Sequence, residues 1–315
     1  MAPLLKADDP ALSWSARHEL FGEAGDPMSL WELPPVRSAL CRQRADGSWR
    51  NPGGREEIRS QRDYDLLASY EALLPLVYQY RLDSRHPAIA AAADFLLGFQ
   101  SEEGDLRGIY GSQYSPNYTA AILATLIDAG YLSDPRVELG IRWLLSIRQN
   151  DGGWTVPWRT RAPAEARSYK VAMRLPKPLA PDHSKPFSHL ITGIVLRALA
   201  AHPAYRTGPE ARLGATLLAS RFFKPDAYPD RRAAVYWEKL RYPFRWTDIV
   251  SALDAITQVG IGREDQQVQA ALQWLAQHQR PDGLWRSPYE KARDPHIHHW
   301  VSFAIARLFR RLEPA

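Results

Sequence analysis

The sequence contains a single cysteine, Cys41, in 315 residues. One cysteine excludes an internal disulfide and any cysteine-rich zinc or iron–sulfur centre. A chain of this length buries enough surface to fold without either kind of cross-link. The sequence also has little excess of charge of either sign, because 40 Lys and Arg stand against 35 Asp and Glu. The resulting net charge of +5 gives no reason to expect a nucleic-acid partner.

Long apolar runs are missing as well. No stretch approaches the ~18 apolar residues that a membrane-spanning helix needs. The first residues, MAPLLKADDPALSW, contain two acids and no long apolar core, so they do not resemble a secretory signal. We therefore expect a cytoplasmic protein without a transmembrane segment, and peripheral membrane contact stays open. The length fits one domain spanning residues 1–315.

A sequence motif recurs along the chain. Each copy is an apolar helical stretch followed by Gln or a substitute, then commonly Asp-Gly and Trp. The copies are CRQRADGSW (41–49), FLLGFQSEEGDL (95–106), WLLSIRQNDGGW (143–154) and WLAQHQRPDGLW (274–285), with a degenerate copy LLASRFFKPDAY (217–228). Their spacing is that of a helical hairpin with its loops, which is the signature of a repeat architecture.

Two kinds of helix alternate between these motifs. The first kind is apolar on most sides and predicts a buried helix; it covers residues 118–131, 190–202, 248–260 and 300–312. The second kind, at 134–149 and 265–279, is amphipathic and predicts an outer helix. No stretch shows the alternation of a strand. We predict an all-α fold, an α/α toroid, which is a two-layer α/α barrel of about five or six hairpins.

The motif resembles the QW repeat of squalene and terpenoid cyclases and the related repeat of protein prenyltransferase β subunits. The resemblance runs from about residue 11 to 312 and implies a single-domain, prokaryotic, cyclase-like member of that superfamily. It also implies that the motif is structural, with the Gln side chains capping helix ends and tying neighbouring hairpins together. The residues in that role are Trp49, Trp154, Trp285, Gln43, Gln100 and Gln279.

The chain lacks the characteristic catalytic acid motif of the cyclases and the usual zinc ligands of the prenyltransferases. The cyclases carry an Asp-x-Asp-Asp acid at the start of an inner helix, and this sequence contains no such motif. The prenyltransferases bind zinc through Asp, Cys and His, but the lone Cys41 lies in an outer-helix copy. We expect no resident cofactor, although zinc and magnesium remain open alternatives.

The starts of the inner helices are predicted to line the mouth of a central cavity. Helix N-termini favour anions, and polar or aromatic residues stand at each of these starts. Asp248, between Trp246 and Ile249, is the candidate general acid with a raised pKa, and it is also a candidate helix N-cap. His189 and His299 are the candidate proton relays. The predicted substrate-binding residues are Asp65, Arg107, Tyr110, Tyr114, Asn117, Tyr118, Arg159, Arg161, Trp246, His298 and Trp300.

One segment interrupts the repeat pattern. Residues 155–187 contain six prolines, seven basic residues and two acids, without a helical period. Loops of this length are typically lids, binding loops or disordered segments. A basic lid suits an amphiphile with an anionic head, and a solvated surface loop is the alternative. The acid-rich loop 101–108 is interpreted as a solvated turn in which Arg107 pairs locally.

These observations predict a terpenoid-cyclase-like enzyme acting on an isoprenoid or similar apolar chain by acid/base chemistry. The partner is a small hydrophobic or amphiphilic substrate, held against an aromatic wall of Tyr118, Trp246 and Trp300. Two alternatives remain: a prenyltransferase-like metal enzyme, and a non-catalytic ring that binds lipid or protein. A homodimer that replaces the second domain of the cyclases also stays open.

Overall fold

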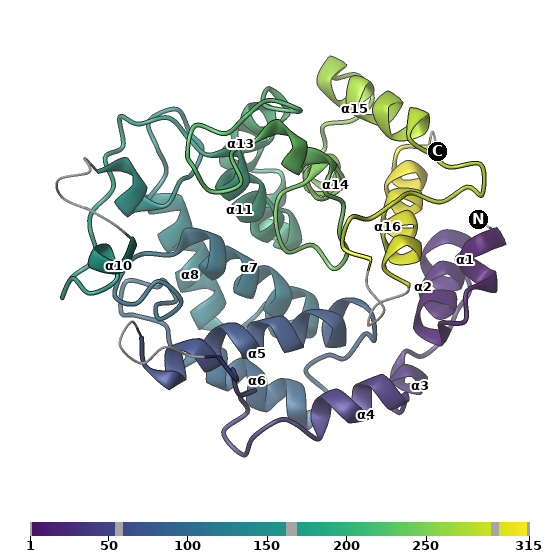
Figure 1. Ribbon diagram of the computed structural model, residues 1–315, viewed down its shortest axis with the longest axis horizontal. Helices are drawn as coiled ribbons and strands as arrows, with labels where there is room; N and C mark the ends of the chain where they lie inside the picture. The colour runs from purple at the N-terminus through teal and green to yellow at the C-terminus, as the bar shows by residue number, and fades with distance from the viewer. Residues whose placement is uncertain (1, 54–58, 162–168, 291–295, 314–315) are drawn as a thin grey trace.

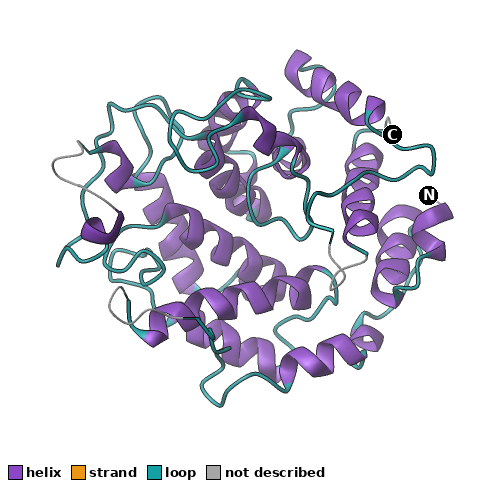
Figure 2. Cartoon of the chain, viewed as in Figure 1, coloured by secondary structure: helices purple, strands orange, loops and turns teal. Residues whose placement is uncertain are grey.

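The chain folds into helices joined by turns and loops (Figures 1 and 2). The computed structural model describes residues 2–53, 59–161, 169–290 and 296–313, and within these ranges only isolated β-bridges occur and no strand. The elements are α1 (Ala2–Lys6), α2 (Pro10–Phe21), α3 (Met28–Trp31), α4 (Pro34–Leu40), α5 (Gln61–Tyr78), α6 (Pro87–Leu97), α7 (Pro116–Leu126), the π-helical turn η1 (Ile127–Tyr131), α8 (Pro135–Ser146), the 3₁₀ turn η2 (Pro157–Thr160), α10 (Tyr169–Ala172), α11 (His189–Ala201), α12 (Pro203–Arg206), α13 (Pro209–Ala219), the 3₁₀ turn η3 (Ala234–Glu238), α14 (Ile249–Val259), α15 (Gln266–Gln277) and α16 (Ile297–Arg311). The all-α prediction is confirmed for this part of the chain.

Polar residues before the helices fix where several of them begin. Asp9, Asp134 and Asp265 each accept hydrogen bonds from backbone N–H groups of the first turn that follows. Ser60 and Asp248 go further and form reciprocal capping boxes with the residue three positions on. The predicted helix starts and the observed ones therefore agree to within a few residues, because local side chains specify them.

The repeated tryptophans join three parts of the chain. The indole N–H groups of Trp49, Trp154 and Trp285 donate to carbonyls ten residues earlier, at 2.8, 2.7 and 2.7 Å. Their backbone N–H groups donate to a hydroxyl on the inner helix that follows, at 2.8, 2.9 and 2.9 Å. Each motif thus anchors the end of an outer helix to the next inner helix, so the tryptophans have the structural role predicted for them.

Two of the three predicted motif glutamines, Gln43 and Gln100, link consecutive hairpins, whereas the described hydrogen bond of Gln279 is local, to the Gly283 carbonyl. The Gln43 amide donates to the carbonyls of Gly47 and Ala88, and the Gln100 amide to those of Gly104 and Arg136. Gly47, Gly104, Gly152 and Gly283 have φ between +81° and +109°, the left-handed conformation that favours glycine. The Asp-Gly turn therefore folds back so that one side chain can reach two backbone segments.

Six helices pack one after another in the order α5, α7, α11, α14, α16, α2. Nearly every residue of α7, α11 and α14 is buried. Further helices lie against this series, with α6 on α5, α8 on α7 and α13 on both α11 and α14. Figure 1 shows that the series brings α16, near the C-terminus, beside α2, near the N-terminus. We call α5, α7, α11, α14, α16 and α2 the inner helices.

The described residues of the segment 155–187 form hydrogen bonds with the rest of the molecule. The Gln113 amide donates to the Lys177 carbonyl at 3.2 Å, and its oxygen accepts from the Leu179 N–H at 2.9 Å. Residues 162–168 of this segment, including Arg167, lie outside the described residues. None of the described residues of 155–187 is among those lining the cavity described below.

Candidate functional site

A cavity of about 500 Å³ lies among the inner helices. Each of the six inner helices contributes residues from its middle or its C-terminal end, for example Tyr78 from α5, Ala201 from α11 and Arg311 from α16. The sequence predicted a cavity mouth at the N-terminal ends of these helices, and this cavity lies toward the opposite ends. The volume is within the range of small-molecule sites, about 300–1,000 Å³.

Aromatic rings form much of the cavity wall. Tyr70 and Tyr78 come from α5, Trp14 from α2, and Tyr242 and Phe244 from the loop before α14. The rings of Tyr242 and Phe244 meet edge to face, with centroids 5.2 Å apart. Aromatic faces attract cations, so such a wall suits a ligand that is apolar or that develops positive charge.

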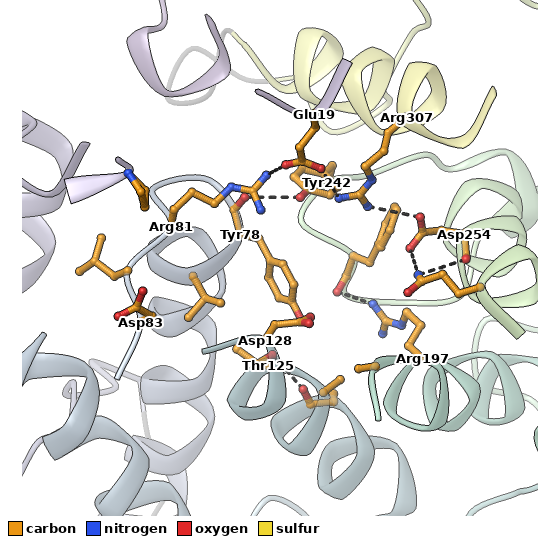
Figure 3. A pocket seen from close by; sticks show the side chains of 18 of the residues that line it. Glu19, Tyr78, Arg81, Asp83, Thr125, Asp128, Arg197, Tyr242, Asp254 and Arg307 are labelled. Atoms are coloured by element: carbon orange, nitrogen blue, oxygen red, sulfur yellow. Dashed lines mark hydrogen bonds and ion pairs between the residues drawn. The ribbon is translucent and has the colours of Figure 1, made fainter. Parts of the chain in front are cut away.

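Ion pairs join the inner helices along one side of the cavity (Figure 3). Glu19 of α2 pairs with Arg81, which follows α5, and with Arg307 of α16. Arg307 and Arg311 both pair with Asp254 of α14, at 3.3 and 3.1 Å. These five side chains connect helices from both ends of the chain.

Asp128 has a different environment. It lies in the turn that directly follows α7, where Gly130 adopts the left-handed conformation (φ +95°) that commonly ends a helix. Its carboxyl faces the cavity and the residue is exposed to solvent there, while the surrounding protein still removes part of the water around the carboxyl. Among the described residues Asp128 forms no ion pair, and the Tyr78 phenol donates a hydrogen bond to its carboxyl.

Burial raises the pKa of the Asp128 carboxyl above its usual value. The hydrogen bond from Tyr78 and the charge of Arg307 oppose that increase, and the charge of Asp254 adds to it. Asp83, another carboxylate of the cavity, shows the opposite shift, because hydrogen bonds from Arg85 lower its pKa. Asp128 is therefore the lining acid best suited to donate a proton.

None of the residues predicted as catalytic or substrate-binding lines this cavity. Asp248, the predicted acid, is the N-cap of α14. One of its carboxylate oxygens accepts from the Ser251 N–H at 2.8 Å, and the other accepts from the Arg241 N–H at 3.2 Å. Burial raises the pKa of Asp248 to about 6, and the hydrogen bonds from Ser251 and Arg241 oppose that increase. The pKa of Asp248 is thus raised, as predicted. The catalytic role of Asp248 stays a prediction.

Replacing Asp248 by Asn is expected to flatten the pH dependence of stability between about pH 4 and pH 6. The folded state holds the Asp248 proton up to a pKa of about 6, against 3.8 in an ordinary aspartate, so stability falls as the pH rises through this window. The full difference is about 3 kcal/mol, because one pKa unit corresponds to roughly 1.4 kcal/mol. Urea unfolding at several pH values measures it.

The matched control for that experiment is Asp265→Asn. Asp265 caps α15 in the same way but is only half-buried. Its replacement should leave the slope between pH 4 and pH 6 unchanged. If Asp248→Asn keeps the slope of the wild type, the buried Asp248 carboxyl does not titrate as described.

The two predicted proton relays have described partners other than Asp248. His189 begins α11, with its Nδ1 3.3 Å from Asp226, and its ring packs on Trp237 with centroids 4.5 Å apart. Burial lowers the pKa of His189, so the imidazole is neutral at physiological pH. His299 lies against His298 in α16, and burial and the neighbouring histidines lower its pKa. The described contacts do not bring the three predicted catalytic residues together.

Several predicted aromatic residues do meet, one layer behind the cavity wall. The ring of Tyr118 touches those of Tyr110 at 5.4 Å, Tyr70 at 6.4 Å and Trp246 at 6.4 Å. Asn117 donates to the Tyr110 hydroxyl at 3.1 Å. Trp300 stacks on Tyr242, with centroids 5.8 Å apart. Tyr118 and Trp300 therefore support the lining residues Tyr70 and Tyr242.

The remaining predicted residues form local polar contacts. Asp65 accepts from Arg44 at 2.7 Å, and His298 lies 3.7 Å from Glu290. Arg107 pairs with Glu103 and Asp105, and Tyr114 donates to Glu103 at 2.6 Å. Arg159 pairs with Asp230 at 2.7 Å, and Arg161 donates to the Ala180 carbonyl at 2.7 Å. The loop 101–108 thus has the locally paired Arg107 that the sequence suggested.

The sequence does contain a signal for the residues that line the cavity. Asp128, Arg197 and Asp254 each stand inside a strongly apolar helical stretch. A charge at such a position must find a partner or a polar cavity. The same argument that singles out Asp248, at the start of its helix, extends to these charges further along the inner helices.

Two kinds of feature are absent from the described residues: a group of metal ligands and a membrane-spanning helix. No group of three or more His, Cys, Asp or Glu side chains in these ranges is placed to hold a metal ion. Within the same ranges, none of the helices combines the length and apolarity needed to cross a bilayer.

Comparisons with known proteins leave the family open. No family model matches the chain, and no curated protein matches it. One solved structure, described as a protein from Actinoplanes, aligns with 91% of this chain and 99% of its own at 18% identity, with a TM-score of 0.32.

Proposed function

We propose that the chain is a closed two-layer α/α toroid, a terpenoid-cyclase-like enzyme that acts on an isoprenoid or similar apolar chain. The order of packing, α5, α7, α11, α14, α16 and α2, supports a ring of inner helices. The ion pair between Arg81, after α5, and Glu19, in α2, supports contact between the two ends of that series. The ring would surround the cavity and hold the substrate.

The observation that carries this proposal is the Asp128 carboxyl in an aromatic-lined cavity. A protonated carboxylic acid can transfer its proton to a carbon–carbon double bond of the substrate. The double bond then becomes a carbocation, and Asp128 becomes a carboxylate. In this proposal Asp128 takes the acid role first considered for Asp248, whose two carboxylate oxygens both cap backbone N–H groups.

The surroundings of Asp128 favour a cationic intermediate. Tyr70, Tyr78 and Phe244 present rings that attract positive charge. The inner helices direct their C-terminal ends toward the cavity, and the helix dipole makes those ends negative. Loss of a proton from the cation to water would complete an isomerisation, so the product would have the formula of the substrate.

Mass spectrometry of molecules that purify with the protein tests this proposal. Ala124 lines the cavity from α7, whereas Ala270 lies exposed on α15. Ala124→Phe should fill the cavity and abolish the bound apolar molecule, and Ala270→Phe should retain it. Circular dichroism of both variants checks that the helices are intact. Equal amounts of the molecule in the folded variants would place its binding site elsewhere.

A further inference from the structure

One cation of the cavity differs from the other three. Arg81 pairs with Glu19, Arg307 with Glu19 and Asp254, and Arg311 with Asp254. Arg197 of α11 forms no ion pair with any described carboxylate. Its single described hydrogen bond runs from Nη1 to the Phe244 carbonyl at 2.6 Å. The buried Nε and Nη2 atoms have no hydrogen-bond partner.

An unpaired guanidinium in such a position is costly. Removing a charge from water carries a large penalty unless an opposite charge or a full set of hydrogen bonds compensates it. The Arg197 side chain is only partly exposed, and part of its remaining surface faces the cavity (Figure 3). A ligand anion is therefore the partner that would compensate this cation.

The surfaces around Arg197 suit an apolar chain. Ala201 lies one turn further along α11, on the same face of the helix. Ala121 and Ala124 line the cavity from α7, which packs against α11, and Tyr70 lines it from α5. A chain that starts at Arg197 would thus lie against small apolar side chains and aromatic rings.

The charge of the cavity limits the charge of the head group. Four carboxylates, Glu19, Asp83, Asp128 and Asp254, line the same space as the four arginines. Asp83 pairs with Arg85 outside the cavity, and Asp128 is protonated in the proposed function, so Arg197 is the lining cation without an ion pair and one negative charge balances it. A second negative charge would face carboxylates without a free cation.

We propose that the cavity binds an apolar chain with a singly charged anionic head, a carboxylate, which pairs with Arg197. A carboxylate would accept two parallel hydrogen bonds from Nε and Nη2, and because both atoms are buried in this structure, the Arg197 side chain has to turn toward the cavity to donate them. The inference rests on the proposed function, because it concerns the same cavity, and it defines the substrate class. An amphiphile with a diphosphate head fits this charge balance less well.

Calorimetric titration with octanoate, octanol and octyl phosphate at pH 8 tests the inference. The three probes share one chain and carry one, no and about two negative charges. Octanoate should bind the wild type about ten- to a hundredfold more tightly than octanol, as expected for a charged hydrogen-bonded pair. Octyl phosphate should bind more weakly than octanoate.

Arg197→Gln should lower the affinity for octanoate to that for octanol and leave octanol unchanged. Arg197→Lys keeps the charge without the fork and should retain part of the preference for octanoate. The control is Arg142→Gln, an exposed arginine in an i,i+4 pair with Glu138, which should change neither affinity.

Four results would overturn the inference. Equal binding of octanoate and octanol to the wild type would remove the anion site while leaving the proposed function in place. Equal losses of both probes in Arg197→Gln would make Arg197 a structural residue only. Tighter binding of octyl phosphate than of octanoate would contradict the single charge. Binding of none of the three probes would overturn the proposed function as well.

Discussion

Replacing Asp128 by Asn is expected to reduce conversion of the bound molecule by about 10²- to 10⁴-fold, the usual contribution of a general acid. Asparagine has nearly the same shape and can still accept the hydrogen bond from Tyr78, but it cannot transfer the proton. Liquid chromatography with mass spectrometry should find the product in extracts of the wild type. Extracts of Asp128→Asn should contain an unconverted molecule of the same formula at a different retention time.

The control for this experiment is Asp83→Asn. Asp83 also lines the cavity, but hydrogen bonds from Arg85 hold its carboxylate. Its replacement should leave conversion unchanged. Conversion in the wild type should also decline as the pH rises through the raised pKa of Asp128, because only the protonated acid donates. If both variants and the wild type contain the same unchanged molecule, the protein binds without converting.

Replacing Trp154 by Ala should destabilise the protein by about 3–5 kcal/mol, the usual cost of deleting a large core aromatic. The Trp154 side chain is fully buried, and its indole donates to the Leu144 carbonyl of α8 at 2.7 Å. Its ring also packs against Gly214 of α13, where a Cβ would come within 3.0 Å of it. The substitution therefore leaves a cavity and an unpaired carbonyl where three helices meet. Urea unfolding measures the loss.

Trp274→Ala is the matched comparison. Trp274 lies on α15 and is partly exposed, with its ring stacked on His278 at 4.0 Å. Its replacement should cost about 1 kcal/mol, as is typical of substitutions outside the core. Equal losses for the two variants would mean that the repeated motif does not hold the helices together as its hydrogen bonds indicate.

Local patterns were sufficient to predict several of the helices. The apolar stretch at 190–202 became α11, and that at 248–260 became α14, each within a residue. The Asp-Gly turns were also predictable, because glycine favours the left-handed conformation that Gly47 and Gly152 adopt. These features depend on neighbours in sequence, so the sequence alone specifies them.

The place of the cavity depends on packing between distant helices. Whether a cavity opens toward the start or the end of the inner helices follows from how bulky side chains fill each end. The aromatic cluster of Tyr110, Tyr118 and Trp246 occupies the space near the start of α7, and Tyr70 separates it from the cavity. Asp128 and Arg197 come together with Tyr78 only through the packing of α5, α7 and α11.

Titration of the aspartate side chains by carboxyl ¹³C NMR tests the central claim most directly. The account predicts that Asp128 titrates above the usual 3.8 of an aspartate, because protein surrounds its carboxyl in the cavity. Asp83 is the internal reference, since hydrogen bonds from Arg85 place its titration below that value. Assignment through Asp128→Asn and Asp83→Asn identifies the two signals. An Asp128 carboxyl that titrates at or below the position of Asp83 would contradict the claim that Asp128 is the proton donor of this cavity.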